Sequence, residues 1–186
     1  METKKDIRKH VLKLRSQLKQ KEWEEKSRKI QDKVVTHPFF LCAETIYCYI
    51  DYRNEVATRS IIQKAWELHK KVAVPKVEGN ELIFYYISSL SNLEIGYKGI
   101  LEPCTNQNAD DKDALIIVPG VAFDLNRNRI GYGKGFYDRY MAKHPGFKTI
   151  GIAFSCQIIS QIEAEQFDCK PDVLITEEDV YESLTK

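Results

Sequence analysis

Residues 114–140 read A-L-I-I-V-P-G-V-A-F-D-L-N-R-N-R-I-G-Y-G-K-G-F-Y-D-R-Y, and this stretch indicates the class of fold. It opens with the apolar run 114–118, which is typical of a buried strand. A loop at 119–128 and a glycine-rich turn then lead into a predicted helix at 136–143. Parallel α/β sheets form their binding sites in such loops, beyond the carboxyl ends of the strands. We therefore expect a functional site here.

The rest of the chain repeats this alternation of strands and helices. Apolar residues recur at helical spacing from Ile7 to Leu18 and from Trp23 to Val34, and the helices are expected to end near His37. The pattern then predicts strands at 45–50, 71–74, 82–87, 149–154 and 173–176, helices at 61–69 and 158–165, and mostly loop at 88–113. Such alternation favours a largely parallel sheet covered on both faces.

Length and charge limit the possible functions. The chain has 186 residues, 43% of them apolar, which is enough for one sizeable core. We expect a single domain, 1–186, with N-terminal helices at 1–37 packed on an α/β core at 43–186. The net charge is +1, so no overall basic field indicates binding to nucleic acid or to an anionic membrane.

Cysteine usage and hydropathy indicate the compartment. The five cysteines form no C-x-x-C pair and, being odd in number, cannot all pair within the chain, so reduced thiols fit best. No stretch approaches the roughly 18 apolar residues of a membrane span, and the charged start lacks the apolar region of a signal peptide. The four histidines show no zinc-ligand spacing. We expect a cytoplasmic protein.

The glycine-rich turn has the features of an anion site. Gly131, Gly133 and Gly135 let the backbone approach a ligand closely. The helix that follows would direct its free N–H groups at an anion. Phosphate is the natural candidate.

The charged residues around these glycines suit ATP. Lys134 supplies a mobile positive charge, and Arg129 and Arg139 offer forked donors to phosphate. Asp138 offers the oxygen ligands that Mg²⁺ prefers. The glycine spacing matches neither a Walker A loop nor the dinucleotide fingerprint. From the residues alone, a phosphate site and a plain glycine-rich turn with solvated charges both remain open.

The same segment resembles the signature of 5-formyltetrahydrofolate cyclo-ligases, P-G-x-A-F-D followed after a short loop by R-[LI]-G-x-G-x-G-[YF]-Y-D. The matching residues are Gly120, Ala122, Phe123, Asp124, Arg129, Gly131, Gly133, Gly135, Tyr137 and Asp138. The resemblance implies a three-layer α/β/α fold with a mostly parallel central sheet. It also implies an enzyme that uses ATP and Mg²⁺ to close 5-formyltetrahydrofolate into 5,10-methenyltetrahydrofolate.

The N-terminus fits this resemblance. Lys4 and Arg8 match the family's K-x-x-x-R and lie one helical turn apart, so both could reach ATP phosphates. Without the signature, a solvated helix face would be the simpler interpretation, and Lys5 would be an equally good candidate.

A second matching element follows the strand at 45–50. Glu55, in N-E-V-A-T, resembles the family's E-[VI]-x-T element that contacts the folate, with Ile50 beside it. Taken alone, Glu55 would be a carboxylate favoured by a helix N-terminus. The family usually has an acidic residue where Ala57 stands here, although Thr58 is retained.

Two further stretches match. Residues 99–103 resemble the family's G-I-x-E-P and are expected to form a turn bordering the site. Asp168 and Asp172 resemble its terminal D-x-x-x-D, in which one aspartate helps to hold magnesium. We select Asp172, with a plain strand-edge carboxylate as the alternative.

The resemblance assigns each site residue a role. Lys134 and Arg129 would be catalytic, and Asp138 and Asp172 would bind Mg²⁺. The residues expected to bind ATP are Lys4, Arg8, Arg129, Ile130, Gly131, Tyr132, Gly133, Lys134, Gly135, Phe136 and Tyr137. Those expected to bind the folate are Ile50, Glu55, Tyr132, Gly133, Lys134, Gly135 and Phe136.

In the implied mechanism, ATP phosphorylates the formyl oxygen, N10 attacks the activated carbon, and phosphate departs. The protein would supply positioning and charge stabilisation without a covalent nucleophile. The expected partners are a reduced folate and ATP, with no nucleic acid and no membrane, and the protein is expected to be a monomer or weak homodimer.

The sequence leaves three alternative functions open. The first is a related nucleotide-dependent enzyme acting on another substrate, and the second is a non-catalytic protein that binds ATP or folate. The presence of Lys134 and Asp138 argues against the second. Nucleic-acid binding rests only on the basic N-terminal helix, where acidic residues are interleaved.

Overall fold

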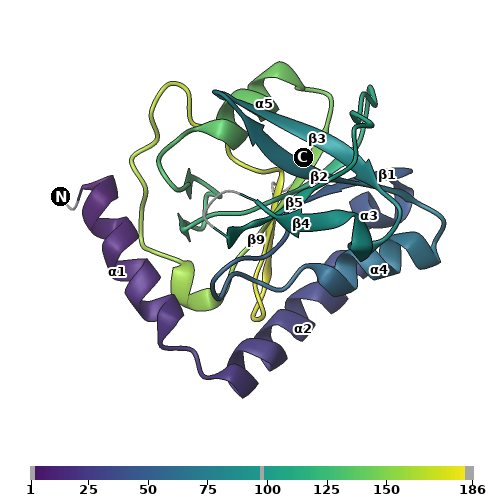
Figure 1. Ribbon diagram of the computed structural model, residues 1–186. Helices are drawn as coiled ribbons and strands as arrows, with labels where there is room; N and C mark the ends of the chain where they lie inside the picture. The colour runs from purple at the N-terminus through teal and green to yellow at the C-terminus, as the bar shows by residue number, and fades with distance from the viewer. Residues whose placement is uncertain (1–2, 97–98, 183–186) are drawn as a thin grey trace.

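A computed structural model describes residues 3–96 and 99–182. Seven strands form the central sheet in the order β11-β10-β9-β6-β1-β2-β3 (Figure 1). They are β1 (Thr45–Cys48), β2 (Lys71–Glu78), β3 (Glu81–Ile87), β6 (Leu115–Val118), β9 (Lys148–Ile152), β10 (Val173–Ile175) and β11 (Val180–Glu182). The four pairings from β2 through β1, β6 and β9 to β10 are parallel. In this seven-stranded sheet the edge strands β3 and β11 pair antiparallel with their neighbours.

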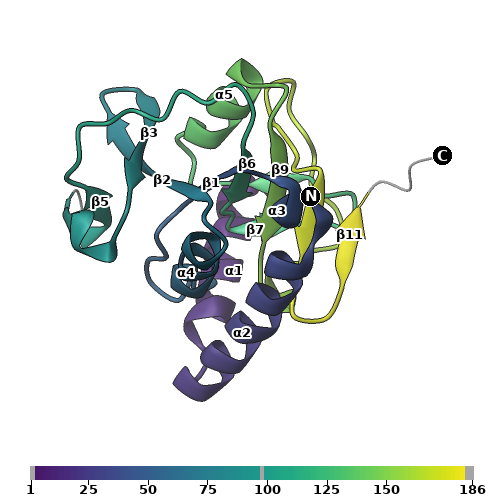
Figure 2. The same ribbon diagram turned by 90° about the vertical axis from the view of Figure 1, so that its right-hand side faces the viewer.

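Helices cover both faces of this sheet (Figure 2). They are α1 (Lys4–Ser16), α2 (Gln20–Thr36), α3 (Pro38–Cys42), α4 (Arg59–Glu67) and α5 (Phe136–Lys143). Buried residues of α2 and α4 join one core cluster with the sheet, and Met141 of α5 joins the cluster on the opposite face. The expected three-layer α/β/α architecture with a mostly parallel sheet is confirmed.

The central strand β6 shows why its sequence is apolar throughout. Leu115 and Ile117 belong to the cluster beneath α2 and α4, whereas Ile116 and Val118 belong to the cluster beneath α5. Side chains alternate between the faces of a strand, and here both faces are covered. All four residues are therefore fully buried.

Strand register brings two loops to one edge of the sheet. Ile46 of β1 pairs with Leu115 of β6, and Cys48 pairs with Ile117. Because the strands are parallel and in step, they end side by side, and the loops at 49–58 and 119–128 begin at the same edge.

Small elements appear where mostly loop was expected. The 3₁₀ turn η1 (Leu90–Asn92) leads into β4 (Leu93–Ile95), which pairs with β5 (Leu101–Pro103). The G-I-x-E-P stretch therefore runs into a short strand. After β6, the pair β7 (Ala122–Phe123) and β8 (Arg129–Ile130) forms a hairpin.

The predicted helix at 158–165 is wrong. After the short 3₁₀ turn η3 (Ser155–Gln157), the backbone N–H of Ile159 donates to the carbonyl oxygen of Phe123, 2.8 Å away. The N–H of Ile162 donates to Oδ2 of Asp124, 3.0 Å away. Ile159 and Ile162 pack on a small cluster with Ile7. Their helix-like spacing thus reflects packing of an extended segment.

Most other elements differ only at their ends. α5 has the predicted bounds, α1 ends before Leu18, and β2 continues to Glu78 to pair with β3. β11 was not predicted. Within residues 3–96 and 99–182, no helix combines the length and apolarity needed to cross a bilayer.

Candidate active site

The loop after β6 is held in shape by a buried carboxylate. Asp124 is fully buried, and its Oδ1 accepts from the backbone N–H groups of Asn126 and Asn128, both 2.9 Å away. Its Oδ2 accepts from the side-chain amide of Asn128 and from the backbone of Ile162. A Cβ on Gly120 would lie 2.5 Å from the ring of Phe123, which explains the glycine there. These residues therefore shape the loop.

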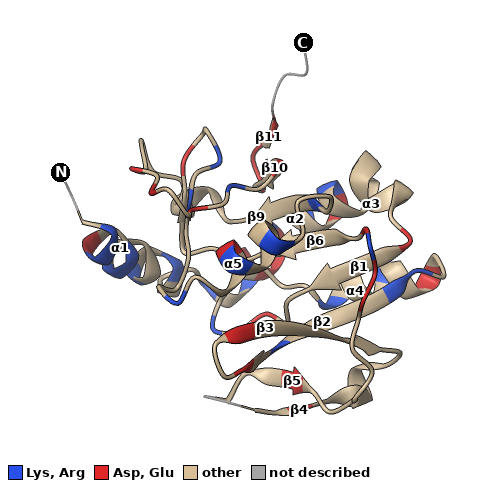
Figure 3. Ribbon diagram, turned by 90° about the horizontal axis from the view of Figure 1, so that it is seen from above, with Lys and Arg blue, Asp and Glu red and all other residues tan. Residues whose placement is uncertain are grey.

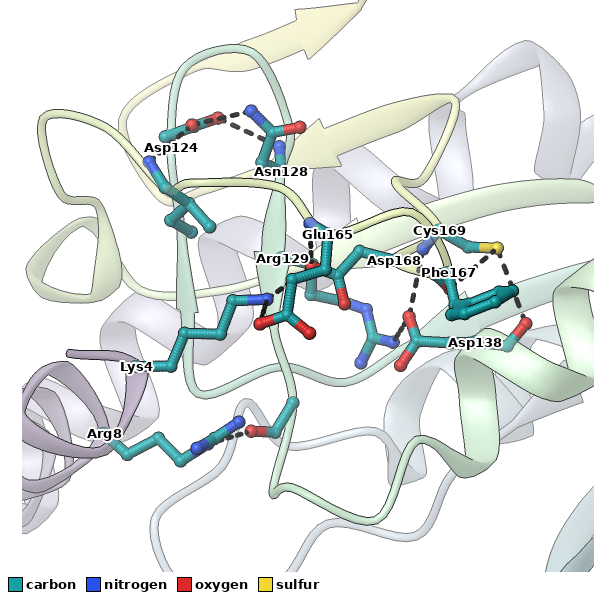
Figure 4. Close-up of polar contacts among 12 residues, drawn as sticks. Lys4, Arg8, Asp124, Asn128, Arg129, Asp138, Glu165, Phe167, Asp168 and Cys169 are labelled. Atoms are coloured by element: carbon teal, nitrogen blue, oxygen red, sulfur yellow. Dashed lines mark hydrogen bonds and ion pairs between the residues drawn. The ribbon is translucent and has the colours of Figure 1, made fainter.

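Arg129 places a fixed positive charge under the glycine-rich turn (Figure 4). Its Nη2 donates to Oδ1 of Asp138 at 2.6 Å, and its Nη1 donates to the carbonyl oxygen of Pro119 at 3.2 Å. The Arg129 side chain is only 3% exposed. A charge-assisted bond with so little solvent around it fixes both partners.

The glycine-rich turn leaves the start of α5 open. Gly133 and Gly135 have φ values of 97° and 65°, a conformation that favours glycine. Gly135 is the N-cap of α5, and no side chain caps the first N–H groups of the helix. Those groups are thus available to an anion. Lys134 is exposed beside them, and its carbonyl oxygen accepts from Nη1 of Arg139 at 2.8 Å.

Helix α1 lies against this turn (Figures 1 and 4). Nε of Arg8 donates to the carbonyl oxygen of Gly131 at 2.8 Å. Nζ of Lys4 lies 2.5 Å from Oδ2 of Asp168 and 2.8 Å from Oε1 of Glu165. Lys5 is exposed. The structure therefore brings Lys4 and Arg8 to the site and turns Lys5 to solvent.

The ion pair of Lys4 alters two pKa values. Burial by itself lowers the pKa of Lys4, but the hydrogen bonds and charges of Asp168 and Glu165 outweigh it and raise that pKa. For Asp168, burial raises the pKa, but the hydrogen bonds from Lys4 and from the backbone of Glu165, together with nearby positive charge, outweigh it and lower the pKa overall. Both groups are charged near neutral pH.

Glu55 lies in the loop after β1, and Tyr132 of the glycine-rich turn covers it. Only 8% of Glu55 is exposed. Its Oε2 accepts from the backbone N–H of Tyr52 at 2.9 Å, and its Oε1 accepts from the hydroxyl of Tyr132. Burial raises the pKa of Glu55, although the bonds from Tyr132 and Tyr52 oppose it. Ile50 lies at the start of this loop and is buried in the core.

The loop that carries Glu55 is closed by a reciprocal pair. Oδ1 of Asp51 accepts from both the backbone and the hydroxyl of Thr58, and the hydroxyl of Thr58 accepts from the backbone N–H of Asp51. Arg53 and Asn54 take positive φ values of 45° and 51° at its tip. The retained threonine thus fixes the loop.

Arg15 is a site residue that the sequence analysis missed. It is 4% exposed, and its Nη2 donates to the hydroxyl of Tyr132 at 3.0 Å and to the carbonyl oxygen of Arg53 at 3.3 Å. Its charge also opposes the rise in the pKa of Glu55. Arg15 continues the buried series Ile7 and Val11 at intervals of four. The signal in the sequence that could have identified Arg15 was its position on the apolar face of the predicted helix.

The structure separates the two aspartates of the D-x-x-x-D element. Asp168 lies with Lys4, and the next residue, Cys169, donates its N–H to Oδ1 of Asp138 at 3.1 Å. Asp172 instead precedes β10, at the amino end of the parallel strands, where its Oδ2 accepts two bonds of 2.9 Å from Thr149. Asp168, rather than the selected Asp172, is thus brought toward Asp138.

Phe136 faces a different neighbourhood from Glu55. It lines a hollow between α5 and β3, and the guanidinium of Arg139 lies 5.2 Å from the centre of its ring. Tyr132, by contrast, contacts Glu55 directly. Of the two aromatic residues expected at the folate, the structure brings Tyr132 to Glu55 and leaves Phe136 beside Arg139.

Comparison with known sequences gives one family. A sequence model of the 5-formyltetrahydrofolate cyclo-ligase family matches residues 1–177. The chain is 28% identical over 162 residues to the 5-formyltetrahydrofolate cyclo-ligase of Escherichia coli K12, covering 81% of this chain and 87% of that protein. It is 32% identical over 170 residues to a probable 5-formyltetrahydrofolate cyclo-ligase of Schizosaccharomyces pombe, covering 81% and 83%.

Comparison of structures agrees. The NMR structure of Aquifex aeolicus 5,10-methenyltetrahydrofolate synthetase matches with a TM-score of 0.87 and 33% identity, covering 98% of this chain and 94% of that one. The Mycoplasma pneumoniae 5,10-methenyltetrahydrofolate synthetase matches with a TM-score of 0.77 and 25% identity, covering 95% and 99%.

Proposed function

Because the chain belongs to the 5-formyltetrahydrofolate cyclo-ligase family, we propose that the site between the glycine-rich turn and Glu55 carries out that family's reaction. The protein is an ATP-dependent ligase that converts 5-formyltetrahydrofolate to 5,10-methenyltetrahydrofolate. One observation supports this location above others. Tyr132, from the turn suited to phosphate, contacts Glu55, so the two substrates would meet there.

The ATP side comprises the glycine-rich turn, the start of α5 and the facing side of α1. Free N–H groups at the start of α5 would bind phosphate oxygens, with Lys134 as a mobile cation above them. Lys4 and Arg8 would reach the phosphates from α1. Arg129 would contribute a fixed charge from below, because Asp138 and Pro119 hold its guanidinium.

The folate side comprises the loop after β1. Glu55 would accept hydrogen bonds from N–H groups of the pterin, because a buried carboxylate held by Tyr52 and Tyr132 is already aligned as an acceptor. Arg15 would hold Tyr132 in place. Ile50 would contribute apolar surface at the start of the loop.

The reaction needs the formyl oxygen to become a leaving group. In the first step a bond forms between the formyl oxygen and the γ-phosphorus of ATP, while the bond from that phosphorus to ADP breaks. N10 then attacks the activated carbon and loses its proton. The carbon–oxygen bond breaks and phosphate leaves, so a methenyl bridge joins N5 and N10. The protein's contribution is positioning and stabilisation of charge.

The donor set fits Mg²⁺ bound together with ATP. Mg²⁺ in such sites takes one or two carboxylates plus phosphate oxygens. Asp138 binds Arg129, and Asp168 precedes Cys169, whose N–H bonds Asp138. Among the residues in the described ranges, no cluster of three or more His, Cys, Asp or Glu could hold a metal without such a partner. Bound Mg²⁺ would neutralise charge on the phosphates. We propose Asp138 and Asp168 as its ligands, and the assignment of Asp172 stays a prediction.

The surface charge agrees with small-molecule substrates. In Figure 3 Lys and Arg are frequent along α1, whereas positions of both charges are scattered among uncharged ones over the rest of the ribbon. A cytoplasmic location, a single domain and a monomer or weak homodimer stay predictions. Light scattering at several protein concentrations would test the last of these.

The direct test is formation of the methenyl product, followed by its absorbance. Purified protein would be mixed with 5-formyltetrahydrofolate, ATP and Mg²⁺, with parallel reactions lacking ATP or Mg²⁺. We expect absorbance to grow only in the complete mixture. A flat trace from protein that still binds ATP would show that the site serves another substrate.

A further inference from the structure

The hydroxyl of Tyr132 lies between two buried groups of opposite charge. It accepts a hydrogen bond from Nη2 of Arg15 at 3.0 Å and donates one to Oε1 of Glu55. Arg15 is 4% exposed and Glu55 is 8% exposed. A buried charge without a partner is costly. The phenol supplies an acceptor to the arginine and a donor to the carboxylate, so one hydroxyl satisfies both.

The surrounding backbone holds both charged groups without help from Tyr132. Nη2 of Arg15 also donates to the carbonyl oxygen of Arg53 at 3.3 Å. Oε2 of Glu55 accepts from the backbone N–H of Tyr52 at 2.9 Å, and Nε1 of Trp23 donates to the carbonyl oxygen of Glu55 at 2.8 Å. The guanidinium and the carboxylate therefore keep their positions when the phenol moves.

Tyr132 is much less enclosed than the two groups it joins. The residue is 51% exposed, although its hydroxyl reaches between Arg15 and Glu55. Gly131 and Gly133 flank it, and Gly133 has a φ value of 97°, so the backbone here is not restricted by side chains. Burial and the charge of Glu55 raise the pKa of the hydroxyl, which keeps its proton. The ring can thus leave without breaking the packing of the core.

The substrate carries the same two kinds of group on one edge. In the pterin of 5-formyltetrahydrofolate, the oxygen at C4 accepts hydrogen bonds, and the neighbouring N3–H and 2-amino groups donate them. A guanidinium beside a carboxylate is complementary to that edge, because the guanidinium only donates and the ionised carboxylate only accepts. The hydroxyl of Tyr132 presents its acceptor and its donor to the same two partners.

We propose that Arg15 and Glu55 together bind this edge of the pterin, and that the hydroxyl of Tyr132 occupies the pterin's position until the folate binds. Arg15 donates to the oxygen at C4, and Glu55 accepts from N3–H and the 2-amino group. This inference rests on the proposed function. It gives Arg15 a direct role in selecting the substrate: the residue holds Tyr132 in the ligand-free protein and the pterin in the complex.

The first test removes the competing hydroxyl. We expect Tyr132→Phe to lower the Kd for 5-formyltetrahydrofolate by about threefold to tenfold, because the folate no longer has to displace a hydrogen bond of that worth. Isothermal titration calorimetry without ATP measures this Kd. Tyr86→Phe is the matched control and should leave the Kd unchanged. Its hydroxyl also donates to a carboxylate, that of Asp111, which binds Thr45 at the start of β1, away from the site.

The second test asks whether Arg15 recognises the oxygen at C4. The two probes are 5-formyltetrahydrofolate and its 4-amino analogue, in which a donor replaces that acceptor. The wild type should bind the 4-oxo form at least about tenfold more tightly, because two donors face each other in the other complex. Arg15→Met keeps a long side chain without donors and should reduce this preference to less than about threefold. Lys13→Met removes an exposed cation from the same turn of α1 and should leave the preference unchanged.

The outcomes separate this inference from the proposed function. If the wild type neither binds 5-formyltetrahydrofolate nor forms the methenyl product, the proposed function fails. If the wild type is active but Tyr132→Phe does not bind the folate more tightly, only the present inference fails. Equal weakening of both probes by Arg15→Met would indicate a structural role and would also overturn it.

Tighter binding by Tyr132→Phe, together with loss of the 4-oxo preference in Arg15→Met, would support the inference. Because Tyr132 is half exposed, its variant decides the question even where Arg15→Met fails to fold.

Discussion

The hydroxyl of Tyr132 donates a hydrogen bond to Oε1 of Glu55, a residue 77 positions away in the chain. This contact joins the glycine-rich turn to the loop after β1. These two segments are far apart along the sequence. The guanidinium of Arg15 holds the same hydroxyl from α1. Three distant segments therefore converge on one carboxylate, and its surroundings decide what the site can bind.

Removing Glu55 should affect the folate more than ATP. We expect Glu55→Ala to raise KM for 5-formyltetrahydrofolate at least tenfold, since a buried hydrogen-bonding carboxylate is lost, and to change KM for ATP by less than about twofold. Steady-state kinetics with each substrate varied in turn would measure this. Glu81→Ala, at the exposed ion pair with Lys143, is the control. Equal effects on both KM values would count against the assignment of Glu55.

Lys134 should act on ATP. Lys134→Ala is expected to lower kcat/KM for ATP by about 30- to 1000-fold, which corresponds to the roughly 2–4 kcal/mol of one preorganised donor. Lys143→Ala removes an exposed lysine from the far end of α5 and should leave kcat/KM unchanged. Near wild-type kcat/KM for Lys134→Ala would exclude it from the phosphate site.

A comparison of three aspartates tests the Mg²⁺ site. We expect Asp138→Asn and Asp168→Asn to raise the Mg²⁺ concentration for half-maximal rate by about tenfold or more, and Asp172→Asn to change it little. Each removed carboxylate is a hard oxygen ligand, but Asp172 binds Thr149 at the opposite end of the strands. A Mg²⁺ titration of all three variants is the measurement. A large shift for Asp172→Asn alone would restore the prediction made from the sequence.

The raised pKa of Glu55 predicts a pH effect on stability. Between the unfolded value near 4.5 and the higher folded value, the folded state binds more protons. Stability from this group is therefore full below the unfolded pKa and is lost as pH rises through the folded pKa. Glu55→Gln removes this dependence, so its Tm relative to wild type should increase from pH 4 to pH 7. A constant difference would refute the prediction.

The tight approach at Gly120 predicts a loss of stability. Gly120→Ala would place a methyl group 2.5 Å from the buried ring of Phe123, and we expect it to cost about 1–3 kcal/mol of unfolding free energy. Gly146→Ala is the control, because an added Cβ there meets nothing within 4 Å. Denaturant unfolding of both variants is the test, and equal midpoints would show that the loop relaxes without strain.

Periodicity was sufficient for most of the fold. The apolar run 114–118 and the βαβ pattern at 45–74 favoured a largely parallel sheet, because strands that alternate with helices are covered on both faces, and the parallel pairings of β1 confirm it. The helix expected at 158–165 failed because Ile159 and Ile162 bury one side of an extended segment. Helical spacing of two or three apolar residues cannot distinguish a helix from an extended segment that buries one side.

For the site, the sequence alone determined which residue types are present and which turn carries them. The glycine-rich segment was selected from its own residues, whereas Lys4, Arg8 and Glu55 were selected through the resemblance to the cyclo-ligase signature. Only the tertiary structure decided that Arg15 supports Tyr132 and that Asp168 and not Asp172 faces Lys4. The physical reason is that these relationships depend on which buried side chains meet across elements far apart in the chain. The spacing of residues along the sequence does not reveal which of these side chains come into contact.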